Sequence, residues 1–274
     1  MELAREAAPD IDRLVLSVNA LASAQYDEQL FARARGIGLD SLALLPHFAD
    51  FLLAGVLTPQ VARLRMRYMP PERVDARLDE LTRLGLVSSQ DGRLVAVDQM
   101  RDLLEELLWA RARAATELWA GHDDAVATAT RFSRRVSDAA SPEHDVSVAH
   151  REVPEPADPY LALHTLLTNL RYIRQHDHAV AWSSRGLTAP AMVPMTALWN
   201  GGSVAPDADG VDELVAAGYA TREPVALTPA GEEVRDAIEA ETNERAQVSF
   251  DVLDDTEGQA FLDALRSLPG TVPA

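Results

Sequence analysis

The chain has 274 residues, of which 47% are apolar, and it carries a formal net charge of −18 at pH 7 with no cysteine. Its length suffices for one large or two small domains, and its acidic body repels phosphate backbones and anionic membrane surfaces, which argues against nucleic acid and membranes as partners. The missing cysteines exclude disulfides, thiolate catalysis and cysteine-ligated zinc, and the lack of a long apolar window or a basic N-terminal region leads us to expect a cytoplasmic protein.

The first part of the chain predicts two helices. Apolar residues recur at helical spacing over residues 11–35, with Pro9-Asp10 as a start signal. A second apolar helix is expected over residues 41–53, where Pro46 should kink or divide it.

A helix-turn-helix and a hairpin are predicted next. Thr58 has the character of an N-cap for one helix, and Pro70-Pro71 ends that helix and opens another. Residues 86–97 carry β-branched runs on both sides of Asp91-Gly92, which is a strong hairpin signal. Two helices followed by a hairpin describe a winged helix.

The same order of elements recurs in the second half of the chain. Residues 79–87 (DELTRLGLV) are echoed by residues 212–220 (DELVAAGYA), and a long helix is expected after each hairpin. We interpret this echo as an internal duplication. The predicted fold class is therefore mainly α, with tandem winged-helix modules that carry small β-hairpin wings and are joined by long helices.

These modules define the predicted domains. A first winged-helix-like half covers residues 1–136, and a second covers residues 160–274. Between them, residues 137–159 are rich in Pro, Asp, Glu and Ser without apolar period, which predicts a surface linker. A short final helix is expected over residues 254–269, followed by a loose tail, residues 270–274.

Residues 160–182 are predicted to form one long central helix at the start of the second half. Its apolar face is made of Leu163, Leu166, Leu170, Ile173 and Val180. A neighbouring face presents His164, Leu167, Arg171, Arg174 and His178. This polar face either points to water or lines a cavity, and the sequence leaves both alternatives open.

A cavity beside this helix would be a mostly apolar site for a small organic ligand, apolar or weakly anionic. Arg171 and Arg174 are candidates to bind an anionic group, and His178 is the candidate catalytic acid or base, although the sequence leaves open whether a reaction is catalysed. The candidate ligand-binding residues are His47, Phe48, His164, Arg171, Arg174, His178, Trp182, Met192, Met195 and Trp199. Against this hypothesis, Met and Trp at helical spacing are more often core than pocket.

Two stretches of the sequence resemble a known class of proteins. Residues 84–87 before the first hairpin, and residues 225–231 (VALTPAG) after Gly218-Tyr219, resemble the wing and the following helix of MarR-type transcription regulators. More broadly, the chain is similar to an actinobacterial family of MarR-like helix-turn-helix proteins, and Arg171, Arg174 and His178 match a motif of that family. The resemblance implies two winged-helix-like halves around a central helix, and a regulatory role.

The competing hypothesis is therefore a MarR-like, ligand-responsive regulator that binds DNA through its first module as a homodimer. Arginines would supply the phosphate contacts, and the candidates are Arg65, Arg67, Arg73, Arg77 and Arg93. In the second module, acids such as Asp209, Asp212 and Glu213 stand where DNA would lie. We therefore expect DNA binding to be weakened or lost.

Metal and cofactor sites are not predicted. Neighbouring residues of a helix such as His176 and Asp177 diverge by about 100° and cannot chelate one ion together. His164 and His178 lie about 21 Å apart along a helix, which is too far for a shared ion. No motif in the sequence implies a cofactor.

Overall fold

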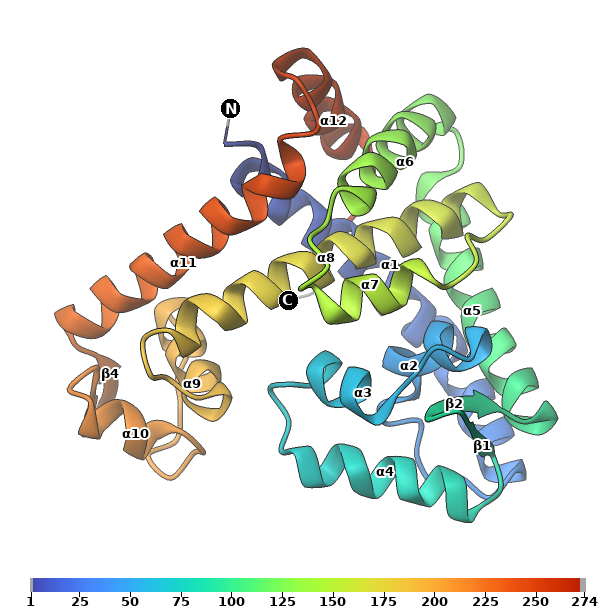
Figure 1. The fold of residues 1–274 in the computed structure, drawn as a ribbon, viewed down its shortest axis with the longest axis horizontal. Coiled ribbons are helices and arrows are strands. Elements are labelled where there is room, and N and C mark those ends of the chain that lie inside the picture. Colours follow the sequence, from blue (N-terminus) through green and yellow to red (C-terminus); the bar gives the residue numbers. More distant parts are fainter. Residues whose placement is uncertain (1, 272–274) are drawn as a thin grey trace.

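The computed structural model describes residues 2–271, and Figure 1 shows their arrangement. In this part of the chain the helices are α1 (Leu3–Gly36), α2 (Leu45–Ala54), α3 (Pro59–Arg65), α4 (Pro71–Arg83), α5 (Asp98–Trp119), α6 (Asp123–Asp138), α7 (Asp145–Arg151), α8 (Pro159–Ser183), α9 (Ala189–Trp199), α10 (Val211–Ala216), α11 (Pro229–Phe250) and α12 (Asp255–Ser267). The strands form two antiparallel hairpins, β1 (Val87–Gln90) with β2 (Arg93–Ala96) and β3 (Ala220–Arg222) with β4 (Val225–Leu227). None of the helices between residues 2 and 271 combines the length and the apolar character that crossing a bilayer requires.

Helix α8 lies at the centre of the molecule and packs against α1, α5, α6, α7 and α11 (Figure 1). It begins at Pro159, where the Asp158 side chain accepts hydrogen bonds from two backbone N–H groups of the first turn at 3.0 and 2.8 Å. The predicted central helix is thus confirmed. Its buried stripe includes Leu167, which we had placed on the polar face, whereas Leu166 and Val180 are only half-buried.

The first hairpin unit is formed by α3, α4, β1, β2 and α5. Thr58 caps α3 by accepting a hydrogen bond from the backbone N–H of Val61 at 3.1 Å, as predicted. The turn residues Asp91 and Gly92 have φ values of 51° and 78°, which a two-residue hairpin turn of this kind requires. The strands pair from Val87 opposite Ala96 to Gln90 opposite Arg93. The predicted hairpin is therefore present.

A second hairpin unit is formed by α9, α10, β3, β4 and α11. Thr228 caps α11 by accepting a hydrogen bond from the N–H of Gly231 at 3.1 Å. A Cβ atom on Gly231 would lie 2.0 Å from the carbonyl oxygen of Tyr219, so the first turn of α11 packs directly on the backbone that precedes β3. Both units place a helix, a hairpin and a helix of 22 residues in the same order.

Three apolar cores hold these elements together. The largest joins α1, α5, α6, α8, α11 and α12, with fully buried residues such as Trp119 and Phe261. The second lies under the first hairpin unit and includes residues of α7 and α8. The third is smaller and belongs to the second hairpin unit, where α9 packs on α10 and α11.

Two helix starts differ from the predicted ones. Helix α1 begins at Leu3 and contains Pro9 in its interior, because Leu3, Ala4 and Ala7 are buried in the largest core. Helix α2 begins at Leu45, which places Pro46 in its first turn. Proline is favourable at that position, so it neither kinks nor divides the helix.

The segment 137–159 is not a surface linker throughout. It contains α7, which packs against α3 and α8 and buries residues such as Val146, Ala149 and His150. Tertiary packing orders this helix although its composition resembles that of a linker. Of the tail that we expected to be loose, residues 270–274, Thr271 is held by a 2.7 Å hydrogen bond from Ser17 to its carbonyl, and residues 272–274 lie outside the described residues.

Candidate ligand cavity

A cavity of about 850 Å³ lies between the central helix and its neighbours. It is lined by one face of α1, by the N-terminal part of α2, by α5 and α8, and by residues near the C-terminal end of α11. Positions of α1 that line it recur three or four residues apart from Ala4 to Phe31, so one face of that helix forms a wall. Its apolar lining includes Ile11, Val15, Leu16, Leu30, Leu107, Leu170 and Phe250. The volume is within the range of small-molecule sites.

Arg65 and His47 form one polar part of the lining. The guanidinium of Arg65, at the end of α3, lies 4.8 Å from the ring centroid of Tyr172 on α8. Its Nη2 donates a hydrogen bond to Nδ1 of His47 at 3.1 Å. Because arginine only donates, His47 accepts at Nδ1 and its ring proton sits on Nε2.

A second polar part is the cluster around Asp50 of α2. Nη1 of Arg111, on α5, lies 3.6 Å from Oδ2 of Asp50, and Nη2 of Arg111 donates to the carbonyl of Pro46. Nε2 of His150, on α7, lies 3.9 Å from the same Asp50 oxygen. Burial alone would raise the pKa of Asp50, but the imidazole of His150 and the charge of Arg111 outweigh it and the pKa is lowered. Asp50 is therefore an anion that offsets Arg111 in the wall.

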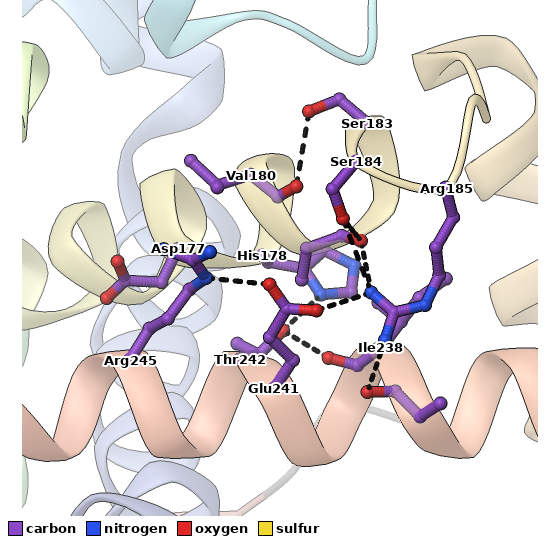
Figure 2. A network of polar contacts seen from close by, with 12 residues as sticks. Asp177, His178, Val180, Ser183, Ser184, Arg185, Ile238, Glu241, Thr242 and Arg245 are labelled. Carbon is purple, nitrogen blue, oxygen red and sulfur yellow. Dashed lines mark hydrogen bonds and ion pairs between the residues drawn. The ribbon is translucent and has the colours of Figure 1, made fainter.

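The polar face of α8 supplies a third part. Nε of Arg171 donates to Asp12 of α1 at 2.6 Å, and Arg174 pairs with Glu239 of α11. Nδ1 of His178 lies 3.0 Å from Oγ1 of Thr242, which donates its own proton to the carbonyl of Ile238 at 2.7 Å. The Thr242 oxygen therefore accepts from His178, and the second nitrogen of a neutral His178 carries a lone pair. Figure 2 shows His178 facing Thr242 across the α8–α11 interface, beside the Arg185–Glu241–Arg245 ion pairs.

The two histidines that α8 contributes to the lining are held in the neutral state. Burial, followed by the charge of Arg111, lowers the pKa of His164 to about 3. Burial and the charges of Arg235 and Arg174 lower the pKa of His178 to about 4, which is the direction expected for an imidazole beside arginines. At neutral pH both rings are uncharged and can accept a proton or a hydrogen bond.

Several buried polar atoms of the lining residues have no hydrogen-bond partner among residues 2–271. They are Oδ1 of Asn19, Nε of Arg65, Nε2 of His164 and Nε of Arg174. His164 is only 4% exposed, although it belongs to the cavity lining. An unsatisfied buried polar group costs about 1–3 kcal/mol, and four such groups around one cavity indicate a place where a polar ligand would be stabilised.

The structure brings together half of the residues predicted for a ligand site. His47, His164, Arg171, Arg174 and His178 line the cavity. Phe48, Trp182, Met192, Met195 and Trp199 do not. Phe48 is fully buried in the core of the first hairpin unit, and Trp182, Met192 and Met195 pack in or against the core of the second unit. Trp199 is 40% exposed and donates a 2.9 Å hydrogen bond to Asp236. The arginines of α8 also find acids other than those nearby in sequence.

The arginines considered for DNA binding are placed very differently from one another. Arg65 lines the cavity, and Arg67 donates to the carbonyl of Leu64 at 2.9 Å. Arg77 is 8% exposed and bonds to Glu80 and to the carbonyl of Ser41. Arg93 pairs with Glu152 at 2.8 Å, whereas Arg73 is exposed on α4.

Sequence reasoning missed Asp12, Asp50, Arg111 and Tyr172 as parts of the site. Asp12 lies on the α1 face made of Ala8, Asp12, Leu16 and Ala20, a spacing of four residues that marks one side of a helix. The other three carry no local signal, because they meet only after α2, α5 and α8 have packed. Within residues 2–271, no group of three or more His, Asp or Glu residues has an arrangement that would hold a metal ion.

Comparison with known proteins gives one result. Searches of curated proteins and of solved structures found no significant match. The model of a helix-turn-helix family matches residues 95–274, a range that runs from within β2 through α8 and the second hairpin unit. Because that match covers more than half of the chain, the protein belongs to this helix-turn-helix family.

Proposed function

We propose that this helix-turn-helix protein binds a small organic molecule, apolar or weakly anionic, in the cavity between α1, α2, α5, α8 and α11. One observation carries the proposal: a cavity of about 850 Å³ has a largely apolar lining, and its lining residues Asn19, Arg65, His164 and Arg174 carry buried polar atoms without a partner among residues 2–271. A core that excluded ligands would bury few polar atoms without partners. Among the described residues, four of the fourteen such atoms belong to residues that line this one space, whose size suits a small molecule.

DNA binding is weak or lost under this proposal. In the second hairpin unit, α10 carries Asp212 and Glu213 in its first turn, and both would face the negative phosphates. In the first unit, Arg77 is buried and Arg93 is paired with Glu152. Few exposed arginines then remain to release counterions from a duplex.

Catalysis is an extension of the same proposal. His178 has a lowered pKa, and its bond to Thr242 leaves a lone pair on Nε2, so it is the residue that we assign as a base if a reaction occurs in the cavity. Ligand binding alone requires no such step.

The proposal is tested with N-phenyl-1-naphthylamine, a neutral aromatic probe that fluoresces in apolar sites. We expect saturable binding by the wild type and at least about tenfold weaker binding by Ala20→Trp, because a new indole on the lining face of α1 would narrow the cavity. Ala24→Trp is the matched control, since Ala24 is also exposed on α1 but does not line the cavity. Equal binding by the two variants would contradict a site in this cavity.

The second candidate is a MarR-like regulator whose DNA binding responds to the ligand. The family match favours it, as do Arg73 and Arg83, which are exposed on α4. A gel-shift assay with the DNA around its own coding region tests this candidate. Sequence-specific, salt-sensitive retardation that Arg73→Gln weakens would support the regulator and overturn our expectation of weak DNA binding.

A further inference from the structure

We propose that the ligand of the cavity is an amphipathic organic anion, whose charged group binds at Arg65 and His47 and whose apolar body lies along α1. This inference rests on the proposed function, because it names the class of molecule that the same cavity holds. It reassigns the anion site from Arg171 and Arg174, which we had expected from the sequence, to an arginine on a different element.

The first support is the distribution of charges around the cavity. Four arginines line it, namely Arg65, Arg111, Arg171 and Arg174. Three of them have carboxylate partners, in Asp50, Asp12 and Glu239. Among the carboxylates of residues 2–271, none lies within ion-pair distance of Arg65. Arg65 is thus the lining arginine whose charge the described residues leave uncompensated.

The second support is the way in which Arg65 is held. The guanidinium lies over the Tyr172 ring, 4.8 Å from its centroid, and donates a 3.1 Å hydrogen bond to Nδ1 of His47, so two contacts hold it in place. These contacts use one of its five N–H donors, and Nε remains buried without a partner. A planar group with free neighbouring donors matches the two oxygens of a carboxylate or a similar oxyanion.

His47 extends this site with a second kind of donor. Its Nδ1 is occupied by Arg65, so the neutral ring offers an N–H at Nε2. Partial burial and nearby guanidinium groups, led by Arg65 and Arg111, lower the pKa of His47 to about 4. The same guanidinium groups that keep His47 neutral make this end of the cavity favourable for a negative charge.

The apolar part of the lining argues for an amphipathic molecule over a small inorganic anion. On α1 the lining includes the apolar side chains of Leu16, Val15 and Ile11, and Leu170 of α8 adds to this apolar surface. An inorganic ion would leave that apolar space empty or wet. A molecule with a charged group and a hydrocarbon body satisfies both parts of the lining.

The test compares two probes with the same rings. One is 8-anilinonaphthalene-1-sulfonate, and the other is N-phenyl-1-naphthylamine, which lacks the sulfonate. We expect the wild type to bind the anionic probe at least about tenfold more tightly, and Arg65→Gln to weaken that probe about tenfold or more while changing the affinity for the neutral probe less than about twofold. Arg73→Gln, an exposed arginine outside the cavity, is the control and should change neither affinity.

The outcomes distinguish a failure of the anion site from a failure of the proposed function. If the wild type binds both probes equally and Arg65→Gln changes nothing, the anion site is wrong and the proposed function stands. If the wild type binds neither probe, both are wrong. Arg65→Lys guards against misfolding of the first variant, since it keeps the charge but loses the planar pair of donors; we expect an intermediate affinity for the sulfonate, and an unchanged preference in both variants would overturn the inference.

Discussion

Protonation of the buried imidazole of His164 makes the free energy of unfolding depend on pH. An unfolded histidine takes up a proton near pH 6.5, whereas the folded His164 does so at about 3. Between these values the unfolded state binds more protons, so the free energy of unfolding falls as pH falls from 6.5. The contribution of this one group is about 2 kcal/mol at pH 5. Urea denaturation at pH 7 and pH 5 measures how much the free energy of unfolding changes between the two pH values. In His164→Gln this change should be smaller than in the wild type by about 2 kcal/mol. An equal change in both proteins would contradict a neutral, buried His164.

Arg111 is the residue whose loss should cost most stability among the cavity arginines. It and Asp50 have side chains only 10% and 15% exposed, and Arg111 also bonds to the carbonyl of Pro46. Removing one partner of a buried ion pair leaves the other charge uncompensated, so Arg111→Gln should lower the free energy of unfolding by about 3 kcal/mol. Arg113→Gln, exposed on the same helix, is the control and should change it by less than about 0.5 kcal/mol. Similar losses in both variants would refute the buried pair.

For single residues of the site, the sequence predicted which side chains lie together only where they share one helix. The spacing of His164, Arg171, Arg174 and His178 correctly placed them together along α8, because helical periodicity alone decides it. The partners of those residues come from α1 and α11 and could not be predicted from periodicity. Trp199 illustrates the opposite error, since its aromatic side chain suited a pocket but is 40% exposed, with the guanidinium of Arg235 over its ring at 4.3 Å.

The close packing of the first turn of α11 on the backbone before β3 restricts substitution at Gly231. Because a Cβ on Gly231 would meet the Tyr219 carbonyl at 2.0 Å, Gly231→Ala must push α11 away from its hairpin. We expect a loss of about 2 kcal/mol or more in the free energy of unfolding. Gly36→Ala is the matched control: nothing lies within 4 Å of its Cβ position at the end of α1, and the change should be neutral or stabilising by about 0.5 kcal/mol. Thermal denaturation that ranks the two variants equally would contradict this packing.

Elements with local signals were predicted well, and elements fixed by tertiary contacts were not. The cap at Thr58 and the Asp91-Gly92 turn are chemical signals within a few residues, and both were found. The start of α1 and the whole of α7 depend on burial against distant helices. The segment 137–159 therefore had the composition of a linker but the structure of a packed helix.

At the scale of the whole molecule, helix α1 is bonded to the last two helices, α11 and α12. The backbone N–H of Ala4 donates to Gln247 of α11 at 2.9 Å, and Arg13 donates to the carbonyls of Leu265 and Leu268 at 3.0 and 2.9 Å. Helix α12 also contributes three fully buried side chains to the largest core, those of Phe261, Leu262 and Leu265.

Removal of α12 should therefore abolish the fold. Burial of each large apolar side chain contributes about 1.5–3 kcal/mol, so the loss of three is comparable with the total stability of a typical domain. We expect a chain of residues 1–253 to lack a cooperative urea transition by circular dichroism. A transition with the midpoint of the full chain would contradict this expectation.

The packing of α1 against α11 and α12 also has a consequence for folding during synthesis. During synthesis the partners of α1 on α11 and α12 follow it by more than two hundred residues, whereas its partner α5 in the largest core follows much sooner. At roughly 5–20 residues per second, the part of α1 that packs on α11 and α12 stays uncovered for on the order of ten seconds or longer. The surface of α1 that packs on α11 and α12 is thus a natural contact for chaperones that shield apolar helices, and Ala246 and Phe250 of α11 are the last residues of the cavity lining to be made.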